Sequence, residues 1–403
     1  MLSMSITKPK MKEKTVADFF AGIGLVTMGL EKAGWKTVYA LDYEKAKAAA
    51  YENNFGQGHY HVSDIADVKG KDVPDVMLAH ASFPCTDLSV AGARGGIHAG
   101  ESSAFWHFLR ILKEMRAERG DGKPPFVLVE NVEGLLSSNQ GKDLRAVLSS
   151  LNELGYLVDL IMINGANFVP QSRVRIFVVG VHSSAVNVSG LADDILSQQH
   201  NLGSSNARPE KIAEYISANA DLKWYFHSLP NLPQRQISLE EIVDPSAEWW
   251  EKERTEYLYD QMHDRHKIIL EAKKKESRYS YFTVFRRMRV RNGKSLSTAE
   301  LRTDGIAGCL RTPKGGSARQ IIVRAGRGKI DARLINGKEA ARLMGADEFK
   351  INPDLSLNDV LFGFGDAVCV PVLEWLGNHY LNSISSLQQT LRLGRARPVQ
   401  FSV

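Results

Sequence analysis

Short apolar runs alternate with longer amphipathic stretches over the first 180 residues. Five runs are apolar enough to be strands buried on both faces, namely TVADFFAG, KTVYALD, VPDVMLAHA, PPFVLVEN and VRIFVVGV. The stretches LVTMGLEKAGW, YEKAKAAAYENNFG, AFWHFLRILKEMRAERG and GKDLRAVLSSLNELGY have helical spacing, and we expect the first, second and fourth to end near Gly34, Gly56 and Gly155. This alternation predicts a doubly wound α/β sheet, with ligands gathered at the carboxyl ends of its strands.

The regular alternation breaks between residues 181 and 332. This region is rich in Ser and Asn from 183 to 207, aromatic and punctuated by Pro to about 250, and then basic. Regular helical spacing returns from Arg333 with LINGKEAARLMG and GDAVCVPVLEWLGNHYLNSI. We therefore predict a main domain formed by residues 1–180 and 333–386, a smaller irregular domain at 181–332, and a C-terminal tail at 387–403.

The charge distribution is strongly asymmetric. Residues 265–330 contain 18 Lys and Arg against 4 Asp and Glu, whereas the rest of the chain contains 33 basic and 42 acidic residues. A solvated basic face is one interpretation. Because Tyr279, Tyr281, Phe282 and Phe285 are interleaved with the charges, we favour a polyanion as partner, most simply nucleic acid.

Composition narrows the remaining possibilities. The chain has 403 residues, 43% of them apolar and 24% charged, and no window approaches the ~18 uninterrupted apolar residues of a membrane span. The basic N-terminus has no apolar segment followed by a cleavage site, so we expect a cytoplasmic protein. Cys85, Cys309 and Cys369 lie far apart without a CxxC pair, and we expect no disulfide framework and no metal site. We interpret Cys309 and Cys369 as packing residues.

The stretch DFFAGIGLVTMGL places Gly22 and Gly24 between a strand and a helix, where the backbone can approach a ligand closely. A dinucleotide-binding loop would need a third glycine where Thr27 stands, so NAD is disfavoured. Asp42 ends the second predicted strand, where it can accept both hydroxyls of a ribose. Asp64 in HVSDIAD lies at the next strand end, where it can accept from an adenine amino group. The alternative is that both carboxylates cap helices. We favour a nucleoside ligand.

Two further segments carry candidate catalytic groups. In SFPCTDLSVAG, Cys85 follows an apolar run rather than lying inside it, which is typical of a nucleophile. In PPFVLVENVEG, Glu130 and Asn131 end an apolar strand, where a carboxylate is costly to desolvate without a partner. Glu130 could instead cap the following helix. In the predicted fold, Cys85 and Glu130 lie at neighbouring strand ends.

The segment VPQSRVRIF contains paired guanidinium groups. Arg173 and Arg175 are two residues apart on a predicted strand and therefore share a face, as does Gln171. Paired guanidinium groups suit a carboxylate or a phosphate, although an exposed salt-bridged edge is the common alternative.

Taken in order, DFFAGIG, PCTDLSVAG, ENVEG, QSRVRIF and GDAVCVPV resemble the signature blocks of the DNA (cytosine-5) methyltransferases of bacterial restriction-modification systems. The resemblance covers about residues 14–180 and 333–386 and leaves between them the region that reads DNA in this family. Within that region, GCLRTPKGGSARQ (residues 308–320) also resembles a stretch found in some bacterial members. The resemblance implies a Rossmann-like, S-adenosylmethionine-dependent methyltransferase domain with a smaller target-recognition domain.

The resemblance also implies a mechanism. Cys85 adds to C6 of a flipped-out cytosine and so makes C5 nucleophilic, while Glu130 holds N3 and the exocyclic amine. Arg175, with Arg173 and Asn131, binds the base or holds Cys85 and Glu130 in place. The methyl group of S-adenosylmethionine passes to C5, leaving S-adenosylhomocysteine. The glycine-rich segment Gly92–Glu101 is expected to close over the DNA.

Further site residues follow from the same matching. The cofactor pocket is expected to be lined by Phe20, Gly22, Gly24, Asp42, Tyr43, Asp64, Ile65, Pro84 and Val368. Apart from that matching, DNA contacts are expected from Gln171, which shares a strand face with the two arginines, and from Arg286, Arg287, Arg311, Lys314 and Arg319 of the basic region.

Several positions depart from the family pattern. Phe83 and Thr86 flank Pro84-Cys85 where the family commonly has Pro and Gln. Asp42 stands where Glu is usual, and Asp366 and Asn336 stand where Asn and Thr are usual. No departure removes a catalytic group.

Two other functions remain open at this level. A tRNA cytosine-5 methyltransferase would normally have a recognition region shorter than the one here, which favours DNA. A catalytically silent, methyltransferase-like DNA-binding regulator is disfavoured because Cys85, Glu130 and Arg175 are all present. We expect a monomer that acts on double-stranded DNA, with a cognate restriction endonuclease or other defence-system proteins as partners.

Overall fold

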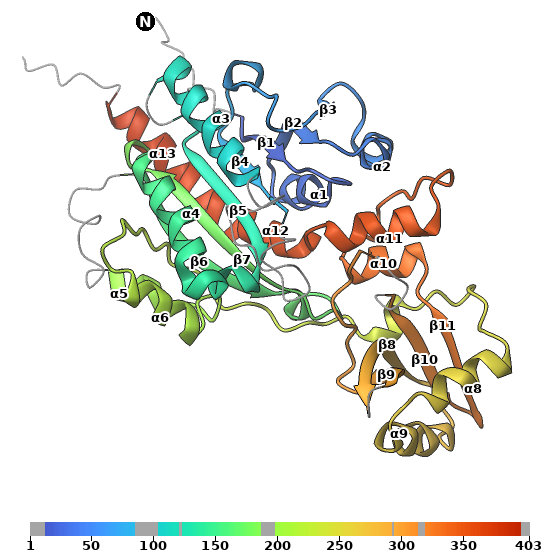
Figure 1. The fold of residues 1–403 in the computed structure, drawn as a ribbon. Helices are drawn as coiled ribbons and strands as arrows, with labels where there is room; N and C mark the ends of the chain where they lie inside the picture. The colour runs from blue at the N-terminus through green and yellow to red at the C-terminus, as the bar shows by residue number, and fades with distance from the viewer. Residues whose placement is uncertain are drawn as a thin grey trace, which may run out of the picture.

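The computed structural model describes residues 13–84, 104–120, 123–186, 198–291, 294–312 and 319–395. Its larger body is built on a seven-stranded sheet with strand order β3-β2-β1-β4-β5-β7-β6 (Figure 1). The strands are β1 (Thr15–Phe19), β2 (Lys36–Asp42), β3 (Tyr60–Val62), β4 (Leu78–Ala81), β5 (Phe126–Val132), β6 (Tyr156–Asn164) and β7 (Val174–His182). The α/β fold class predicted from the sequence is confirmed.

Strand direction divides this sheet into two parts. The five strands from β3 to β5 are parallel, whereas β7 runs antiparallel to both β5 and β6. The sheet is therefore mixed rather than purely parallel. Strand β6 (YLVDLIMIN) was not predicted, and it begins directly after the Gly155 turn that closes the preceding helix.

Helices cover both faces of the sheet. They are α1 (Leu25–Lys32), α2 (Lys45–Phe55), α3 (Ala104–Arg119), α4 (Lys142–Glu153), α10 (Gly337–Leu343), α11 (Leu357–Asp366), α12 (Val370–Leu376) and α13 (Asn382–Arg395). Alternate residues of β5 enter opposite cores: Phe126 packs with α1 and α12, whereas Val127 packs with α3 and α4. Such a strand must be apolar at every position, and this explains the continuous apolar run in the sequence. Helices α1, α2 and α4 end just before Gly34, Gly56 and Gly155, as predicted.

The smaller body contains helices α8 (Lys252–Asp260) and α9 (Asp264–Lys274) and a four-stranded sheet of order β11-β10-β8-β9 (Figure 1). Its strands are β8 (Ser280–Arg291), β9 (Lys294–Arg302), β10 (Ile321–Gly326) and β11 (Lys329–Leu334). The two bodies have separate cores, since Leu258, Leu270, Phe282 and Val284 form a cluster of their own.

The segment before the smaller body belongs to the larger one. It contains α5 (Gln199–Leu202), α6 (Glu210–Ala218) and α7 (Leu239–Ile242). Ile212, Ile216 and Trp224 pack into the same core as α3 and α4, and Trp224 bridges to Val158 of β6. The packing therefore favours a recognition domain that starts near residue 250, later than the expected boundary at 181.

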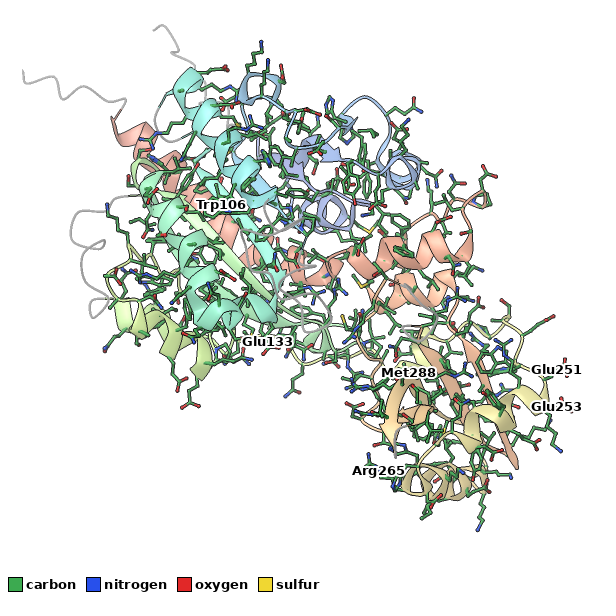
Figure 2. All side chains as sticks on the ribbon, in the orientation of Figure 1. Trp106, Glu133, Glu251, Glu253, Arg265 and Met288 are labelled. Atoms are coloured by element: carbon green, nitrogen blue, oxygen red, sulfur yellow. The ribbon has the colours of Figure 1, made fainter. Side chains whose placement is uncertain are left out.

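Strand β8 is paired along its length by two different neighbours. Residues 280–284 pair with β10 and residues 283–291 pair with β9, so from Phe285 to Arg291 the partner within the described sheet is β9 alone. The outer halves of β8 and β9 therefore form a two-stranded ribbon that extends beyond the body of the sheet. Met288, labelled in Figure 2, lies on this ribbon.

One helical run among the described residues, Leu357–Gln388, is long and apolar enough to cross a membrane by length and composition. Within its most apolar window, 72% is buried inside the protein. A helix in the core of a protein meets the same criterion, so this run is weak evidence for a membrane span.

Candidate active site and cofactor pocket

Several predicted site residues meet at the carboxyl ends of β1, β2, β4 and β5. Strands β4 and β5 are neighbours, with Ala81 opposite Val129, so the segment that leaves β4 lies beside Glu130 and Asn131. This is the segment Ser82–Pro84, which leads to Cys85. Cys85 itself, Thr86 and the glycine-rich segment 92–101 lie outside the described residues.

Glu130 has an ion-pair partner. Nε of Arg175 lies 2.9 Å from Oε1 of Glu130, and only 6% of Glu130 is exposed. The ion pair follows from the sheet register. Arg175 of β7 lies opposite Val132 of β5, and Val132 is two residues from Glu130, so the side chains of Arg175 and Glu130 lie on the same face of the sheet. This arrangement satisfies a carboxylate that would otherwise be costly to bury, and it leaves the helix-capping alternative without support.

Asn131 fixes the segment that leads to Cys85. Its Nδ2 donates to the carbonyl of Phe83 over 3.1 Å, and its Oδ1 accepts from the amide of Val132 over 2.9 Å. Phe83 is buried and its ring lies 5.3 Å from that of Phe105, centroid to centroid. The departure at Phe83 is thus accommodated by packing against α3.

Arg173 and Gln171 join the two bodies of the molecule. The buried Arg173 donates to the carbonyls of Leu310, Gly365 and Ala367. The fully buried Gln171 donates to the carbonyl of Leu343 over 2.7 Å and accepts from the amide of Leu310 over 2.9 Å.

These contacts correct the expectation that Gln171 contacts DNA. Its amide group satisfies backbone groups that would otherwise be buried without partners, and none of its surface is exposed. Arg173 likewise faces the junction between the bodies, whereas Arg175 faces Glu130. Of the two arginines, Arg175 is therefore the one that contacts Glu130, the candidate catalytic acid.

Cys309 is a neighbour of this site that sequence reasoning assigned to packing. Nη1 of Arg173 donates to its sulfur over 3.2 Å. Burial raises the pKa of the Cys309 thiol, but the guanidinium groups of Arg173, Arg175 and Arg311 outweigh burial and bring the pKa below its ordinary value. Cys369, in contrast, is buried, and burial raises its pKa to about 12. The sequence signal for Cys309 was its place in GCLRTPKGGSARQ.

The loop after β1 and the end of β2 form one unit. Oδ2 of Asp42 accepts from the amide of Gly22 over 3.0 Å, and Oδ1 accepts from the amide of Glu44 over 3.0 Å. Burial raises the pKa of the Asp42 carboxyl above its ordinary value, although Lys47 and these two amides oppose the change. The carboxylate is therefore held in a fixed orientation at the sheet edge.

The two glycines of this loop are required for different reasons. Gly22 and Gly24 both have positive φ, of 56° and 90°. A Cβ on Gly24 would lie 2.3 Å from the ring of Phe55, whereas a Cβ on Gly22 would meet no atom of the described residues within 4 Å. Gly24 thus allows α1 and α2 to pack closely, and the space that a side chain at Gly22 would occupy is open.

The other expected cofactor residues surround the same edge. Asp64 is exposed and its Oδ1 accepts from the amide of Ala66 over 2.8 Å, so it closes a turn in addition to any ligand contact. Tyr43 is 59% exposed. Ile65 and Val368 are buried, and Phe20 and Pro84 are half-buried.

Lys47 is a residue that sequence reasoning missed. Its Nζ lies 3.1 Å from Oδ2 of Asp366 and 3.0 Å from Oε1 of Glu44. Burial alone would lower the pKa of Lys47, but Asp42, Asp366 and Glu44 raise it above its ordinary value. The departure at Asp366 is thereby explained, because its charge is neutralised by a lysine that also lies near Asp42.

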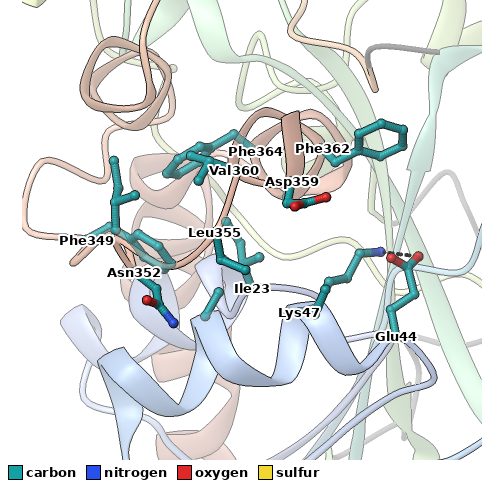
Figure 3. Close-up of a pocket in the computed structure, with 14 residues that line it drawn as sticks. Ile23, Glu44, Lys47, Phe349, Asn352, Leu355, Asp359, Val360, Phe362 and Phe364 are labelled. Atoms are coloured by element: carbon teal, nitrogen blue, oxygen red, sulfur yellow. Dashed lines mark ion pairs between the residues drawn. The ribbon is translucent and has the colours of Figure 1, made fainter. Parts of the chain in front are cut away.

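Lys47 also lines a pocket of about 200 Å³ between α2 and α11 (Figure 3). Apolar side chains form most of its wall, including Ile23 from the glycine loop and Phe349 and Phe364 from the C-terminal part. Because Ile23 lines it, this pocket contacts the glycine loop, near which the cofactor is expected.

The expected DNA contacts lie in the smaller body and at its junction with the larger one. Arg286 and Arg287 are consecutive on β8 and therefore point to opposite faces of the ribbon. Arg311 is exposed, whereas Arg319 donates to Oδ1 of Asn358 on α11. Lys314 lies outside the described residues.

The two faces of the ribbon differ in chemistry. One face carries Arg287 and Arg289, and both lie near Glu300 of β9, at 3.8 and 2.7 Å. The other face carries Met288 and Val290, which are 60% and 77% exposed. Exposed apolar side chains among arginines are typical of an interaction surface.

No group of three His, Cys, Asp or Glu side chains converges as metal ligands in the part of the chain that the structure describes.

Comparison with known proteins places this arrangement in a family. A family model described as C-5 cytosine-specific DNA methylase matches residues 14–382. The Type II methyltransferase M.BsuFI of Bacillus subtilis is 36% identical over 169 residues, which are 42% of this chain and 39% of that protein. The Type II methyltransferase M.HaeII of Haemophilus aegyptius is 36% identical over 171 residues, 42% of this chain and 51% of that protein. The matched stretch thus spans about half or less of these relatives.

Solved structures share the fold over nearly the whole chain. The S. pombe Dnmt2 methyltransferase has a TM-score of 0.56 at 16% identity and covers 94% of this chain and 99% of its own. The Entamoeba histolytica methyltransferase EhMeth has a TM-score of 0.60 at 13% identity, with 93% and 99% covered. With the family match over residues 14–382, the chain belongs to the C-5 cytosine-specific DNA methylase family.

Proposed function

We propose that this protein is a sequence-specific DNA (cytosine-5) methyltransferase of the restriction-modification type. The observation that carries the proposal is the buried Glu130–Arg175 pair at the carboxyl end of β5, beside the segment that leads to Cys85. A nucleophile and a held acid at adjacent strand ends suit addition to an electron-poor ring.

The chemistry assigned to the chain's own residues is as follows. The Cys85 thiolate forms a bond to C6 of cytosine, and the electron pair of the C5–C6 double bond becomes available at C5. Glu130, in its protonated form, donates a proton to N3, which relieves the negative charge that builds up on the ring. Arg175 orients Glu130 through its ion pair. After C5 has been methylated, a base removes the C5 proton, and the electron pair of that bond forms the C5–C6 double bond again and expels the Cys85 thiolate. N3 returns its proton to Glu130, which restores the aromatic ring.

The residues at the edge of β1 and β2 fit S-adenosylmethionine. Asp42 has a fixed carboxylate that can accept ribose hydroxyls, and the open side of Gly22 allows a ligand close to the backbone. Tyr43, Asp64 and Ile65 would surround the adenine. When bound there, the cofactor supplies an electrophilic methyl group.

The smaller body supplies the DNA-binding surface in this proposal. Duplex DNA binds through counterion release from arginines and lysines, and the ribbon of β8 and β9 presents several of them. Since the reacting ring atoms are inaccessible in a duplex, the target cytosine must be flipped out of the stack. We further propose a monomer that acts in the bacterial cytoplasm, together with a cognate restriction endonuclease or other defence-system proteins.

Methyl transfer to defined polymers tests this function. Purified protein with radiolabelled S-adenosylmethionine is expected to label duplex DNA and to leave tRNA unlabelled. Labelled tRNA and unlabelled DNA would replace the proposal with an RNA methyltransferase. Tight DNA binding without transfer to either polymer would replace it with a silent regulator.

A further inference from the structure

A network of buried polar side chains lies next to the carboxyl ends of β1 and β4. None of these side chains has a role in the chemistry proposed above. Nδ1 of His80 lies 2.7 Å from Oδ1 of Asp18, and Nε2 of the same ring lies 3.2 Å from Oγ of Ser82. Asp18 and His80 are each 0% exposed. Ser82 is half-buried and stands three residues before Cys85 in the sequence.

The direction of these hydrogen bonds follows from the acceptors. An ionised Asp18 can only accept, so Nδ1 of His80 carries the proton between them. In the neutral ring Nε2 is then an acceptor, and the hydroxyl of Ser82 donates to it. Asp18 therefore sets the tautomer of His80, and His80 sets the rotamer of Ser82.

On its other side, this network forms hydrogen bonds with side chains of α1 and α2. Oγ1 of Thr27 lies 3.5 Å from Oδ2 of Asp18 and 3.1 Å from the hydroxyl of Tyr51. Thr27 and Tyr51 belong to α1 and α2 and are each 0% exposed. Thr27 stands where a dinucleotide-binding loop would have glycine, and this network accounts for its hydroxyl.

Stability is a weak explanation for such a network. A carboxylate and an imidazole taken fully out of water lose hydration that their hydrogen bond only partly replaces, and apolar residues of similar volume are often at least as stable. A fully satisfied buried network does fix geometry, because each member has one allowed orientation. We therefore expect the network to hold a particular part of the backbone in place.

The network ends at Ser82, the first residue after β4. The amide of Ser82 donates to the carbonyl of Phe19 over 3.4 Å, and the carbonyl of Phe83 accepts from Asn131. The last residues before Cys85 are thus tied to β1, to β5 and, through His80, to Asp18. Phe19 directly precedes the cofactor loop Phe20–Gly24.

We propose that Ser82 is a positioning residue for the nucleophile. Its hydroxyl, oriented by His80 and Asp18, fixes the direction in which the chain leaves β4 toward Cys85 and registers that direction against the strand that carries the cofactor loop. This inference rests on the proposed function. It assigns Asp18, His80 and Ser82 a role in the rate of nucleophilic addition and none in binding.

Formation of the covalent adduct tests this role. The probe is duplex DNA with 5-fluorocytosine at the target position, because fluorine at C5 prevents the final loss of a proton and the adduct accumulates. The variant Ser82→Ala is expected to form the adduct about five- to tenfold more slowly at saturating DNA and S-adenosylmethionine, as the loss of one orienting hydrogen bond suggests. The concentrations of DNA and cofactor at half saturation are expected to match the wild type.

A matched control is available in the same sheet. Oγ of Ser184 lies 2.9 Å from Nδ1 of His182 at the far end of β7, so Ser184→Ala removes a similar His–Ser contact away from the site. It is expected to leave the adduct rate unchanged. Equal rates for Ser82→Ala and the wild type, or equal slowing by Ser82→Ala and Ser184→Ala, would overturn the inference. If the wild type forms no more adduct than Cys85→Ser, the proposed function fails first, and the inference falls with it.

Discussion

The two sheets of this molecule solve different problems. In the seven-stranded sheet, polar side chains at the strand ends have fixed partners: Glu130 with Arg175, Asn131 with Phe83, and Asp42 with two backbone amides. In the four-stranded sheet, the outer ribbon leaves Met288 and Val290 largely exposed. We interpret the contrast as a division of roles: the groups proposed for chemistry have a geometry that is fixed before a ligand arrives, whereas the groups proposed for recognition are exposed and can be covered by a partner.

The largest effect is expected at the catalytic acid. Glu130→Gln keeps the shape of the side chain but removes the proton donor, so the single-turnover rate of methyl transfer should fall by about 10²–10⁴-fold. Cofactor affinity, measured by calorimetry, should stay unchanged. Glu133→Gln is the control. Glu133 comes three positions after Glu130 in the sequence, and its half-exposed carboxylate forms an ion pair with Lys211. Similar rates for the two variants would remove Glu130 from the mechanism.

A smaller effect is expected at the ribose acid. Asp42→Ala removes the carboxylate that Gly22 and Glu44 orient, and S-adenosylmethionine affinity should fall by about tenfold or more, the equivalent of one charge-assisted hydrogen bond. Calorimetric titration gives the dissociation constant. Asp67→Ala serves as the control, because Asp67 is an exposed acid in the turn that follows β3. This variant should bind S-adenosylmethionine as the wild type does. Unchanged affinity in Asp42→Ala would place the cofactor elsewhere.

Charge reversal on the ribbon, which lies in the smaller body, should weaken DNA binding. Arg286→Glu with Arg287→Glu is expected to lower affinity at ~0.1 M salt and to reduce the slope of log K against log salt by about 1–2. Fluorescence anisotropy over a salt series measures both quantities. Because these arginines lie on opposite faces, the two single variants show which face meets the phosphates. Lys223→Glu, an exposed site on the larger body, is the control. An unchanged slope in the double variant would exclude phosphate contacts.

The smallest effect is expected at the apolar face of the ribbon. Met288→Ala and Val290→Ala should leave DNA affinity within a few-fold but relax discrimination by about 1 kcal/mol, because apolar contacts in the major groove distinguish thymine methyl groups. Methylation of substrates that differ from the preferred site by one base pair measures this. Ile268→Ala on α9 removes a side chain that is 68% exposed and should change nothing. Unaltered discrimination in both ribbon variants would assign base reading to other residues.

The sequence predicted the elements whose signals are local. Apolar runs with clear limits gave β1, β2, β4, β5 and β7, and glycines with positive φ marked the ends of three helices. The strand β6 was missed because YLVDLIMIN follows a helical pattern with only the Gly155 turn between them. A mostly apolar run of that kind fits a buried helix as well as a strand.

Long-range partners could not be predicted in the same way. Lys47 and Asp366 are 319 positions apart, and only the folded chain brings them within 3.1 Å. Gln171 was expected at the DNA surface because it shares a strand face with Arg173, yet it is buried where the two bodies join. Periodicity gives the face of a strand, but it does not say whether solvent or another segment covers that face.

The central claim is that Cys85 and Glu130 methylate cytosine in DNA, and mapping 5-methylcytosine tests it most directly. The protein and its Cys85→Ser variant would be expressed in a bacterial host free of cytosine methylation, and the host DNA sequenced after bisulfite treatment. The account predicts methylation confined to one short motif with the wild type and none with the variant. Unmethylated DNA from cells that contain folded, S-adenosylmethionine-binding wild-type protein would contradict it.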